Sequence, residues 1–208
     1  MNDKIIIFDI DGTIFNDSFF IDEFYKNLIK AFRLTDQNIK KIRSIYENSK
    51  KENGYFLPSS FLNKITQEFP SIDKNKLQKI FWNIDLFNKS VYKDTDIIKS
   101  MGNLVVIGIF SKGDREFQNY KLSFIRDLLD SEDTYIFTNK IDKLAQVLSN
   151  YPDYKIYLVD DDIDVLIKAK ELDPDIFAIL VDRNNSYKEN KDITNIKQLN
   201  ELKSIIYD

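Results

Sequence analysis

Two aspartates separated by one residue follow a short apolar run near the start of the chain. The run is Ile5–Phe8, and Asp9, Asp11 and Gly12 come next in the sequence IIIFDIDGTIFND. A continuous apolar run of this length is typical of a strand buried on both faces of a parallel sheet. Two carboxylates beyond such a strand cost free energy unless a positive group lies near them. A site that binds a divalent cation and a phosphate group would give each carboxylate a chemical role. Asp9 could then attack phosphorus to form an aspartyl-phosphate, while Asp11 protonates the leaving oxygen and later takes a proton from water.

A second group of carboxylates follows another apolar run, Ile156–Val159. The sequence KIYLVDDDIDVLIKA places Asp160, Asp161, Asp162 and Asp164 there. Clustered carboxylates repel each other unless a cation is bound, although a helix N-terminus enriched in acid would give the same pattern. The chain has no cysteine and no histidine, which excludes a thiolate nucleophile and the usual general base. Any metal site must therefore be built mostly from oxygen, which favours Mg²⁺.

The strand followed by Asp-x-Asp-Gly-Thr at residues 5–13 resembles the first motif of the haloacid dehalogenase-like (HAD) superfamily. The resemblance covers residues 4–15 and about 91–206. It implies that Asp9 is the nucleophile, that Asp11 is the acid–base residue and that the Ile10 carbonyl is a metal ligand. The full set of site residues that we expect on this basis is Asp9, Asp11 and Lys140 for catalysis, Ser111, Lys112, Gly113 and Thr13 for phosphate, and Asp9, Asp11, Asp160, Asp161 and Asp164 for Mg²⁺.

The second motif of that superfamily is an apolar strand ending in Ser or Thr, and NLVVIGIFSKGD supplies a match with Ser111. A hydroxyl, nearby backbone N–H groups and the start of the following helix would hold phosphoryl oxygens. Many relatives have Asn where this chain has Lys112, while Gly113 keeps its place. Lys112 could add positive charge at the site or point to solvent. Further along, SKGDREFQNYKL resembles the relatives' next helix, with Gln118 and Lys121 in familiar places.

The third motif is a lysine near the start of a later helix, which neutralises charge between nucleophile and phosphoryl group. TNKIDKLAQVL offers Lys140 and Lys143. We prefer Lys140, because it comes sooner after a strand, and Lys143 remains the alternative. In the fourth motif many relatives have Gly-Asp, and this chain has Asp160 in place of that Gly or just before it. We expect Asp160 and Asp161 near the metal, with Asp164 as a supporting or alternative ligand.

The elements that must position these residues alternate between strand and helix. Besides Ile5–Phe8, apolar runs predict strands at Leu104–Phe110, Tyr135–Phe137, Ile156–Val159 and Ile176–Val181. Helical spacing predicts helices near residues 117–128, 144–148 and 165–169, and the tail DITNIKQLNELKSII predicts a last helix. Alternation of this kind implies right-handed βαβ units, so we expect an α/β fold with a Rossmann-like, three-layer parallel sheet.

The stretch from about residue 16 to residue 90 has a different character. It contains four segments with apolar residues at helical spacing and no convincing strand, so a helical module is inserted after the first strand. We expect the third helix to start at Ser59 or Ser60, after a loop with Gly54 and Pro58. The predicted division is therefore a core of residues 1–15 and 91–208 and a helical cap of residues 16–90. The cap's position resembles that in the β-phosphoglucomutase-like and phosphoglycolate phosphatase-like branch.

The composition of the chain narrows the range of possible functions and partners further. A net charge of −4 does not favour a broad basic face for nucleic acid, and no apolar run approaches the length needed to span a bilayer. We therefore expect a cytoplasmic protein whose partner is a small phosphorylated molecule; the sequence does not set the oligomeric state. The function we expect is a Mg²⁺-dependent phosphatase that forms an aspartyl-phosphate on Asp9. The alternatives are a phosphotransferase or phosphomutase on the same scaffold and a non-catalytic binding protein, while Asp11 and the acidic cluster disfavour a dehalogenase.

Overall fold

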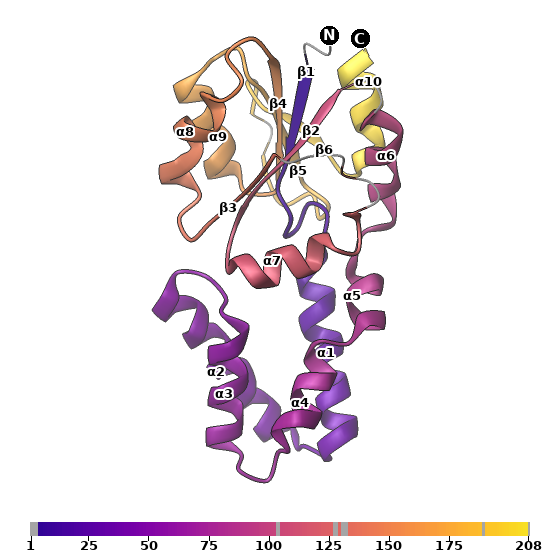
Figure 1. Ribbon diagram of the computed structural model, residues 1–208, viewed down its shortest axis with the longest axis vertical. Helices are drawn as coiled ribbons and strands as arrows, with labels where there is room; N and C mark the ends of the chain where they lie inside the picture. Colours follow the sequence, from indigo (N-terminus) through magenta and orange to yellow (C-terminus); the bar gives the residue numbers. More distant parts are fainter. Residues whose placement is uncertain (1–3, 103–104, 127–128, 130–132, 189, 208) are drawn as a thin grey trace.

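The computed structural model describes residues 4–102, 105–126, 129, 133–188 and 190–207, and it shows a parallel sheet covered by helices on both faces (Figure 1). The strand order is β3-β2-β1-β4-β5-β6, and every neighbouring pair is parallel. The expected α/β, Rossmann-like fold is therefore confirmed. The strands are β1 Lys4–Phe8, β2 Val106–Lys112, β3 Thr134–Phe137, β4 Lys155–Asp160, β5 Phe177–Val181 and β6 Thr194–Ile196.

The two faces of the sheet are covered by different helices because side chains alternate along each strand. On β1, Ile5 and Ile7 join one buried cluster and Ile6 and Phe8 join the other. The first cluster packs against α8 and α9, and the second against α6, α7 and α10. Both faces are buried, which explains why β1 is a continuous apolar run. The helices outside the insertion are α6 Asp96–Gly102, α7 Arg115–Leu122, α8 Leu144–Leu148, α9 Ile163–Leu172 and α10 Leu202–Tyr207, with short 3-10 turns at Lys93–Thr95, Ile141–Lys143 and Leu199–Glu201.

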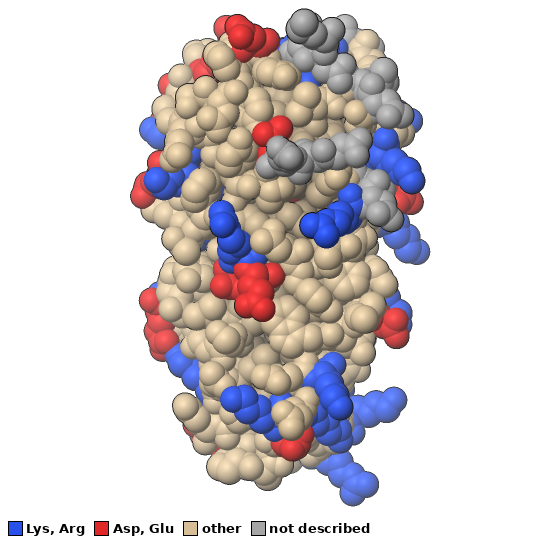
Figure 2. Space-filling view, in the orientation of Figure 1, with Lys and Arg blue, Asp and Glu red and all other residues tan. Residues whose placement is uncertain are grey.

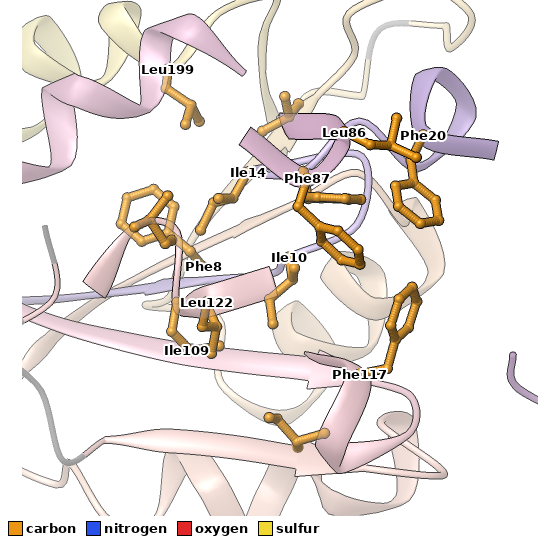
Figure 3. Packing of buried hydrophobic residues seen from close by; sticks show 14 of the residues in the cluster. Phe8, Ile10, Ile14, Phe20, Leu86, Phe87, Ile109, Phe117, Leu122 and Leu199 are labelled. Carbon is orange, nitrogen blue, oxygen red and sulfur yellow. The ribbon is translucent and has the colours of Figure 1, made fainter. Parts of the chain in front are cut away.

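Six α-helices lie between β1 and β2 in the chain, and Figure 1 places the first five of them at the end of the sheet where α7 lies. Their aromatic side chains continue the apolar core from the sheet into this region. Phe20 on α1 lies with its ring centroid 4.7 Å from that of Phe87 on α5 and 6.1 Å from that of Phe117 on α7, and Figure 3 shows the three rings close together. The five helices are α1 Asp17–Phe32, α2 Asp36–Asn53, α3 Pro58–Glu68, α4 Lys74–Phe81 and α5 Ile84–Ser90.

Two short segments join these helices to the sheet, and they lie side by side. Phe15 and Val91 form an isolated antiparallel bridge, and the backbone N–H of Asn16 donates to the carbonyl of Ser90 at 2.7 Å. The chain thus leaves and re-enters the sheet region at one place. No helix in the described part of the chain is long and apolar enough to cross a membrane. On the face drawn in Figure 2, acidic and basic side chains are both present over a largely uncharged surface.

Several boundaries differ from those predicted. Helix α3 begins at Pro58, with Leu57 as its N-cap, and not at Ser59 or Ser60, because proline suits the first helical position, where no intrahelical N–H bond is needed. The prediction of a single helix for the tail is wrong. The first part of the tail, Thr194–Ile196, pairs with β5 as a sixth strand, so Ile196 is part of the sheet and does not lie on a helix. Helices α5 and α6 were not predicted as separate helices, and of the predicted elements, Leu104 and residues 127–128 lie outside the described residues.

Candidate active site

Three side chains from distant parts of the chain meet beyond the carboxyl ends of β1 and β4. The Lys140 ammonium donates to a carboxylate oxygen of Asp9 at 2.6 Å and to one of Asp160 at 2.5 Å. Asp9 directly follows β1, Asp160 is the last residue of β4, and Lys140 precedes the turn Ile141–Lys143. All three side chains are at least nine-tenths buried. The central strands of the sheet therefore deliver two carboxylates to one ammonium group.

Asp161 completes a group of carboxylates around this point. Asp9, Asp160 and Asp161 each offer an oxygen, and these atoms lie within 4.8 Å of one another. The Asp161 side chain packs against Gly12, where a Cβ atom would lie only 2.0 Å from a carboxylate oxygen of Asp161. Gly12 also has a φ of +75°, which side chains other than glycine rarely adopt. The turn after β1 thus requires glycine both for its conformation and for the space that Asp161 occupies.

Burial and mutual repulsion change the proton affinity of these groups. Desolvation, together with the charges of Asp160 and Asp11, raises the pKa of Asp9 from 3.8 to about 7, although Lys140 opposes the shift. Desolvation and the nearby Asp9 and Asp160 raise the pKa of Asp161 to about 8. For Lys140, desolvation lowers the pKa, but Asp160 and Asp9 outweigh it and leave the pKa above its usual value. The lysine is therefore a permanent cation in a site that still holds excess carboxylate.

Asp11 is held apart from that group by two side chains of α7. Lys121 donates to one carboxylate oxygen of Asp11 at 2.5 Å, and Gln118 donates to the other at 2.7 Å. The two donors are three residues apart, so they lie on the same face of the helix. Lys121 is almost fully buried and its ammonium lies 4.2 Å from the ring centroid of Phe117. Asp11 itself is partly exposed, so its carboxylate is oriented and still faces the cavity.

The end of β2 lies beside Asp11. Ser111 is buried, and its hydroxyl oxygen is 3.4 Å from the amide nitrogen of Gln118. The same Gln118 nitrogen donates to the carbonyl of Lys112 at 2.8 Å. At Gly113, where φ is +151°, a Cβ atom would lie 2.8 Å from that nitrogen. Gln118 thus joins Asp11 to the β2 end, and the lack of a side chain at Gly113 leaves room for it.

These groups line a cavity of about 480 Å³ that lies between the sheet and the inserted helices. Asp9, Asp11, Ser111, Lys140 and Asp161 are among its lining residues. Lys112 and Gly113 also line it, and the Lys112 side chain is exposed. The opposite side is formed by α1, α2 and the loop that follows α2. A small molecule in this cavity would therefore touch the acidic strand ends and the helical segment at once.

Four expectations are not met by the geometry. Asp164 is exposed on α9 and is not in the carboxylate group, since the chain has turned into the helix there. Asp11 is not in the group either, because its carboxylate accepts hydrogen bonds from Lys121 and Gln118. The Thr13 side chain is buried away from the cavity lining, so the structure does not place it for phosphate binding. The Ile10 carbonyl accepts hydrogen bonds from the backbone N–H groups of Ile14 and Phe15 in the turn, so in this structure it is engaged there and not in the carboxylate group. Lys143 is exposed and does not reach the carboxylates, which favours Lys140.

One supporting group escaped the sequence analysis. Arg183, just after β5, donates to the carbonyls of Gly12 and Thr13 at 3.3 and 2.8 Å. It also makes a two-point ion pair with Asp94, at 2.9 and 3.2 Å, and its guanidinium lies 3.6 Å from the ring centroid of Tyr92. Arg183 therefore holds the turn after β1 against the segment that returns from the inserted helices. A single arginine after a strand gave no sequence signal for this role.

Comparison with solved structures shows how widely this arrangement of elements occurs. The chain is similar to a Burkholderia xenovorans protein assigned to the haloacid dehalogenase-like hydrolases, with 20% identity, a TM-score of 0.76 and coverage of 97% of this chain and 98% of that one. It is similar to the magnesium-bound YfnB of Bacillus subtilis, assigned as a HAD hydrolase, with 12% identity, a TM-score of 0.64 and full coverage of both. It is also similar to a HAD phosphatase from Thermococcus onnurineus, with 18% identity, a TM-score of 0.59 and coverage of 98% and 97%.

The chain therefore has the fold of the HAD-like hydrolases. Further matches include haloacid dehalogenases and a Thermotoga maritima protein assigned as a β-phosphoglucomutase, so the fold alone does not select one reaction. No protein-family model matches the sequence, and no curated protein matches it. The reaction must be argued from the side chains in the cavity.

Proposed function

We propose that this chain is a Mg²⁺-dependent phosphatase that hydrolyses a small-molecule phosphomonoester through a covalent intermediate on Asp9. The observation that carries the proposal is the arrangement of two separate carboxylate positions at one cavity. Asp9 lies with Lys140, Asp160 and Asp161, whereas Asp11 is outside that group and is held by Lys121 and Gln118. A reaction with one nucleophilic and one proton-transferring carboxylate needs such a separation.

The chemistry assigned to the chain's own residues has two steps. In the first, a carboxylate oxygen of Asp9 attacks phosphorus, the bond to the leaving oxygen breaks, and Asp11, which enters this step protonated, gives that oxygen its proton. In the second, a water attacks the phosphorus of the aspartyl-phosphate, Asp11 takes the water's proton, and inorganic phosphate leaves with Asp9 restored. Lys140 offsets negative charge near the nucleophile, and the Ser111 hydroxyl and the backbone near Gly113 hold phosphoryl oxygens.

A divalent cation fits the residues present. When all three carboxylates are ionised, they and one ammonium leave two negative charges in excess at the Asp9 end, and their oxygens are close enough together to share one ion. All are oxygen ligands, as Mg²⁺ prefers. Asp9, Asp160 and Asp161 are the residues that would hold it. Bound there, Mg²⁺ would supply the positive charge that brings an anionic phosphate to an anionic nucleophile.

The same groups argue against dehalogenation. Removal of a halide from carbon releases an anion that needs no proton, so a protonating carboxylate at position 11 would have no task in that step. An anionic cluster like that of Asp160 and Asp161 would also oppose an anionic substrate unless a cation were present. Phosphate ester hydrolysis uses both features. We therefore assign the phosphatase reaction, with water as the acceptor.

The test is phosphate release from p-nitrophenyl phosphate with Mg²⁺, with and without excess chelator. We expect metal-dependent turnover that falls by at least about 10³-fold in Asp9→Asn, because the amide is no longer a nucleophile. Asp164→Asn is the matched control, since Asp164 is exposed and outside the carboxylate group. Substantial turnover by Asp9→Asn, or full activity in chelator, would contradict the proposal. Halide release from a 2-haloacid without phosphate release would favour the dehalogenase.

A further inference from the structure

The cavity has two sides of different chemistry. Its polar side is made of the carboxylates, Lys140 and Ser111 that are described above. The facing side comes mainly from the inserted helices and consists largely of rings and one branched aliphatic chain. The members of this second set, which we call the aromatic wall, are Phe15, Phe20, Ile21, Tyr46, Tyr55, Phe56 and Phe117.

Four members of the aromatic wall are only partly buried, so they have surface left to offer a ligand. These are Ile21 on α1, Tyr46 on α2, and Tyr55 and Phe56 in the loop after α2. The others are buried and support them. The Phe56 ring centroid lies 4.8 Å from that of Tyr46 and 5.5 Å from that of Phe117, so the exposed rings are backed by a packed aromatic layer. The wall is thus a supported surface and not a set of isolated side chains.

The charged groups on this side are few and close to one another. Desolvation and the charge of Asp11 raise the pKa of Asp17, while the charges of Lys121 and Lys50 lower it. The Lys50 ammonium lies 5.1 Å from the ring centroid of Tyr46. Lys50 and Asp17 both line the cavity. Among the described residues on this side, the other polar side-chain groups are the hydroxyls of Tyr46 and Tyr55, so a polyhydroxylated body would find few hydrogen-bonding partners here.

We propose that the substrate of this site carries its phosphate on a body with a planar aromatic ring, which lies against Tyr46, Tyr55 and Phe56. This inference rests on the proposed phosphatase function. An aromatic body gains favourable ring–ring contacts there, beyond the apolar area that it buries. A sugar would instead turn several hydroxyl groups toward a wall whose polar atoms are mainly two tyrosine hydroxyls, and hydroxyls left unpaired weaken binding. The cavity volume of about 480 Å³ suits a phosphate group and a body of one or two rings.

The experiment compares two esters whose leaving groups are both primary alcohols, so that leaving-group acidity does not decide the result. The substrates are benzyl phosphate and ribose 5-phosphate, with p-nitrophenyl phosphate as the general reporter of phosphatase activity. We expect kcat/KM for benzyl phosphate to exceed that for ribose 5-phosphate by at least about tenfold, because the wall pairs with the ring and leaves sugar hydroxyls unpaired. Turnover of p-nitrophenyl phosphate together with equal or better use of ribose 5-phosphate would overturn the aromatic inference and leave the phosphatase standing. No turnover of any of the three would overturn the phosphatase, and this inference with it.

Substitutions in the aromatic wall test whether it causes the preference for benzyl phosphate over ribose 5-phosphate. Tyr55→Ala should lower the ratio of the two kcat/KM values about tenfold, whereas Tyr55→Phe should keep it, because the ring face and not the hydroxyl makes the contact. Phe56→Leu should lower the ratio too, and thermal unfolding of this variant checks that the helices remain packed. Tyr207→Ala is the matched control, since Tyr207 is an exposed tyrosine on α10 that does not line the cavity. An unchanged ratio in both Tyr55→Ala and Phe56→Leu would contradict the assignment.

Discussion

The Lys140 ammonium lies 2.6 Å from a carboxylate oxygen of Asp9, although the two residues are 131 positions apart in the sequence. The same nitrogen contacts Asp160, so one cation is shared by the ends of two neighbouring strands. Both carboxylates are buried, so loss of the lysine would leave two poorly hydrated charges without their close partner. Lys140 therefore contributes both to the stability of the fold and to the charge balance of the proposed site.

Replacement of this lysine should affect both properties. Lys140→Met leaves two buried carboxylates without their cation, so we expect the free energy of unfolding in chelator at pH 7.5 to fall by about 2–4 kcal/mol. Phosphatase activity should fall by about 10²–10³-fold, because a charge that stabilises the transition state is lost. Urea unfolding and phosphate release are the measurements. Lys143→Met is the control, and if it proved the more damaging change, the choice between the two lysines would be reversed.

The raised pKa values of Asp9 and Asp161 predict how pH affects the metal-free protein. Their pKa values rise on folding from 3.8 to about 7 and about 8, so the folded chain binds protons more tightly than the unfolded chain. The stability contributed by these groups is therefore full below about pH 4 and is lost as the pH rises through 7 and 8. We therefore expect the melting temperature in chelator to fall as the pH rises from about 4 to about 8.

Magnesium should counter that loss, because it binds the deprotonated carboxylates. The increase in melting temperature on adding saturating Mg²⁺ should be larger at pH 8.5 than at pH 5.5, by at least about 4 °C. Asp161→Asn should reduce both the increase and its pH dependence, whereas Asp164→Asn should leave both unchanged. An increase that is the same at both pH values would argue that the cation does not bind these carboxylates.

Lys121 should act on the reaction through Asp11. Lys121→Met removes the ammonium that fixes one oxygen of Asp11, so we expect kcat to fall about 10–100-fold while KM changes much less. Steady-state kinetics with p-nitrophenyl phosphate measure the two separately. Lys168→Met, at an exposed lysine on α9, is the control. A change confined to KM would place Lys121 in substrate binding and not in the orientation of Asp11.

Arg183 should matter mainly for stability and for the turn after β1. Arg183→Met breaks the ion pair with Asp94 and removes the donors to the Gly12 and Thr13 carbonyls, and we expect a loss of about 2–4 kcal/mol in urea unfolding. Arg183→Lys should recover only part of it, because an ammonium cannot make the two-point pair. Arg43→Met, at an exposed arginine, should cost less than about 1 kcal/mol. Equal losses in the two methionine variants would show that Arg183 has no special role in the turn.

The sequence allowed the sheet core to be predicted because each of its main strands is an apolar run. It did not reveal β6, since the three residues Thr194–Ile196 precede a helical pattern and become a strand only by pairing with β5. The start of α3 was misplaced because Pro58 was interpreted as part of the loop and not as the first helical residue. Short elements of this kind depend on their neighbours more than on their own residues.

For the site, sequence reasoning placed Asp9, Lys140, Asp160 and Asp161 near one another, as the structure has them. These residues come next to recognisable strands. The restraint of Asp11 by Lys121 depends on a contact across 110 positions, which spacing along the chain cannot reveal. The i, i+3 pair of polar residues Gln118 and Lys121 on an otherwise apolar helix face was the available signal, and it was noted only through the resemblance.

The place of β1 in the middle of the sheet has a consequence for synthesis of the chain. A ribosome makes β1 before the other strands of the sheet, and its two neighbours, β2 and β4, follow only after about 100 and 150 further residues. Until then the apolar strand has open hydrogen-bonding edges, which invite association with other chains. The five helices translated next give the nascent chain an early apolar cluster, but β1 gains its last partner only when β4 emerges, together with Asp160.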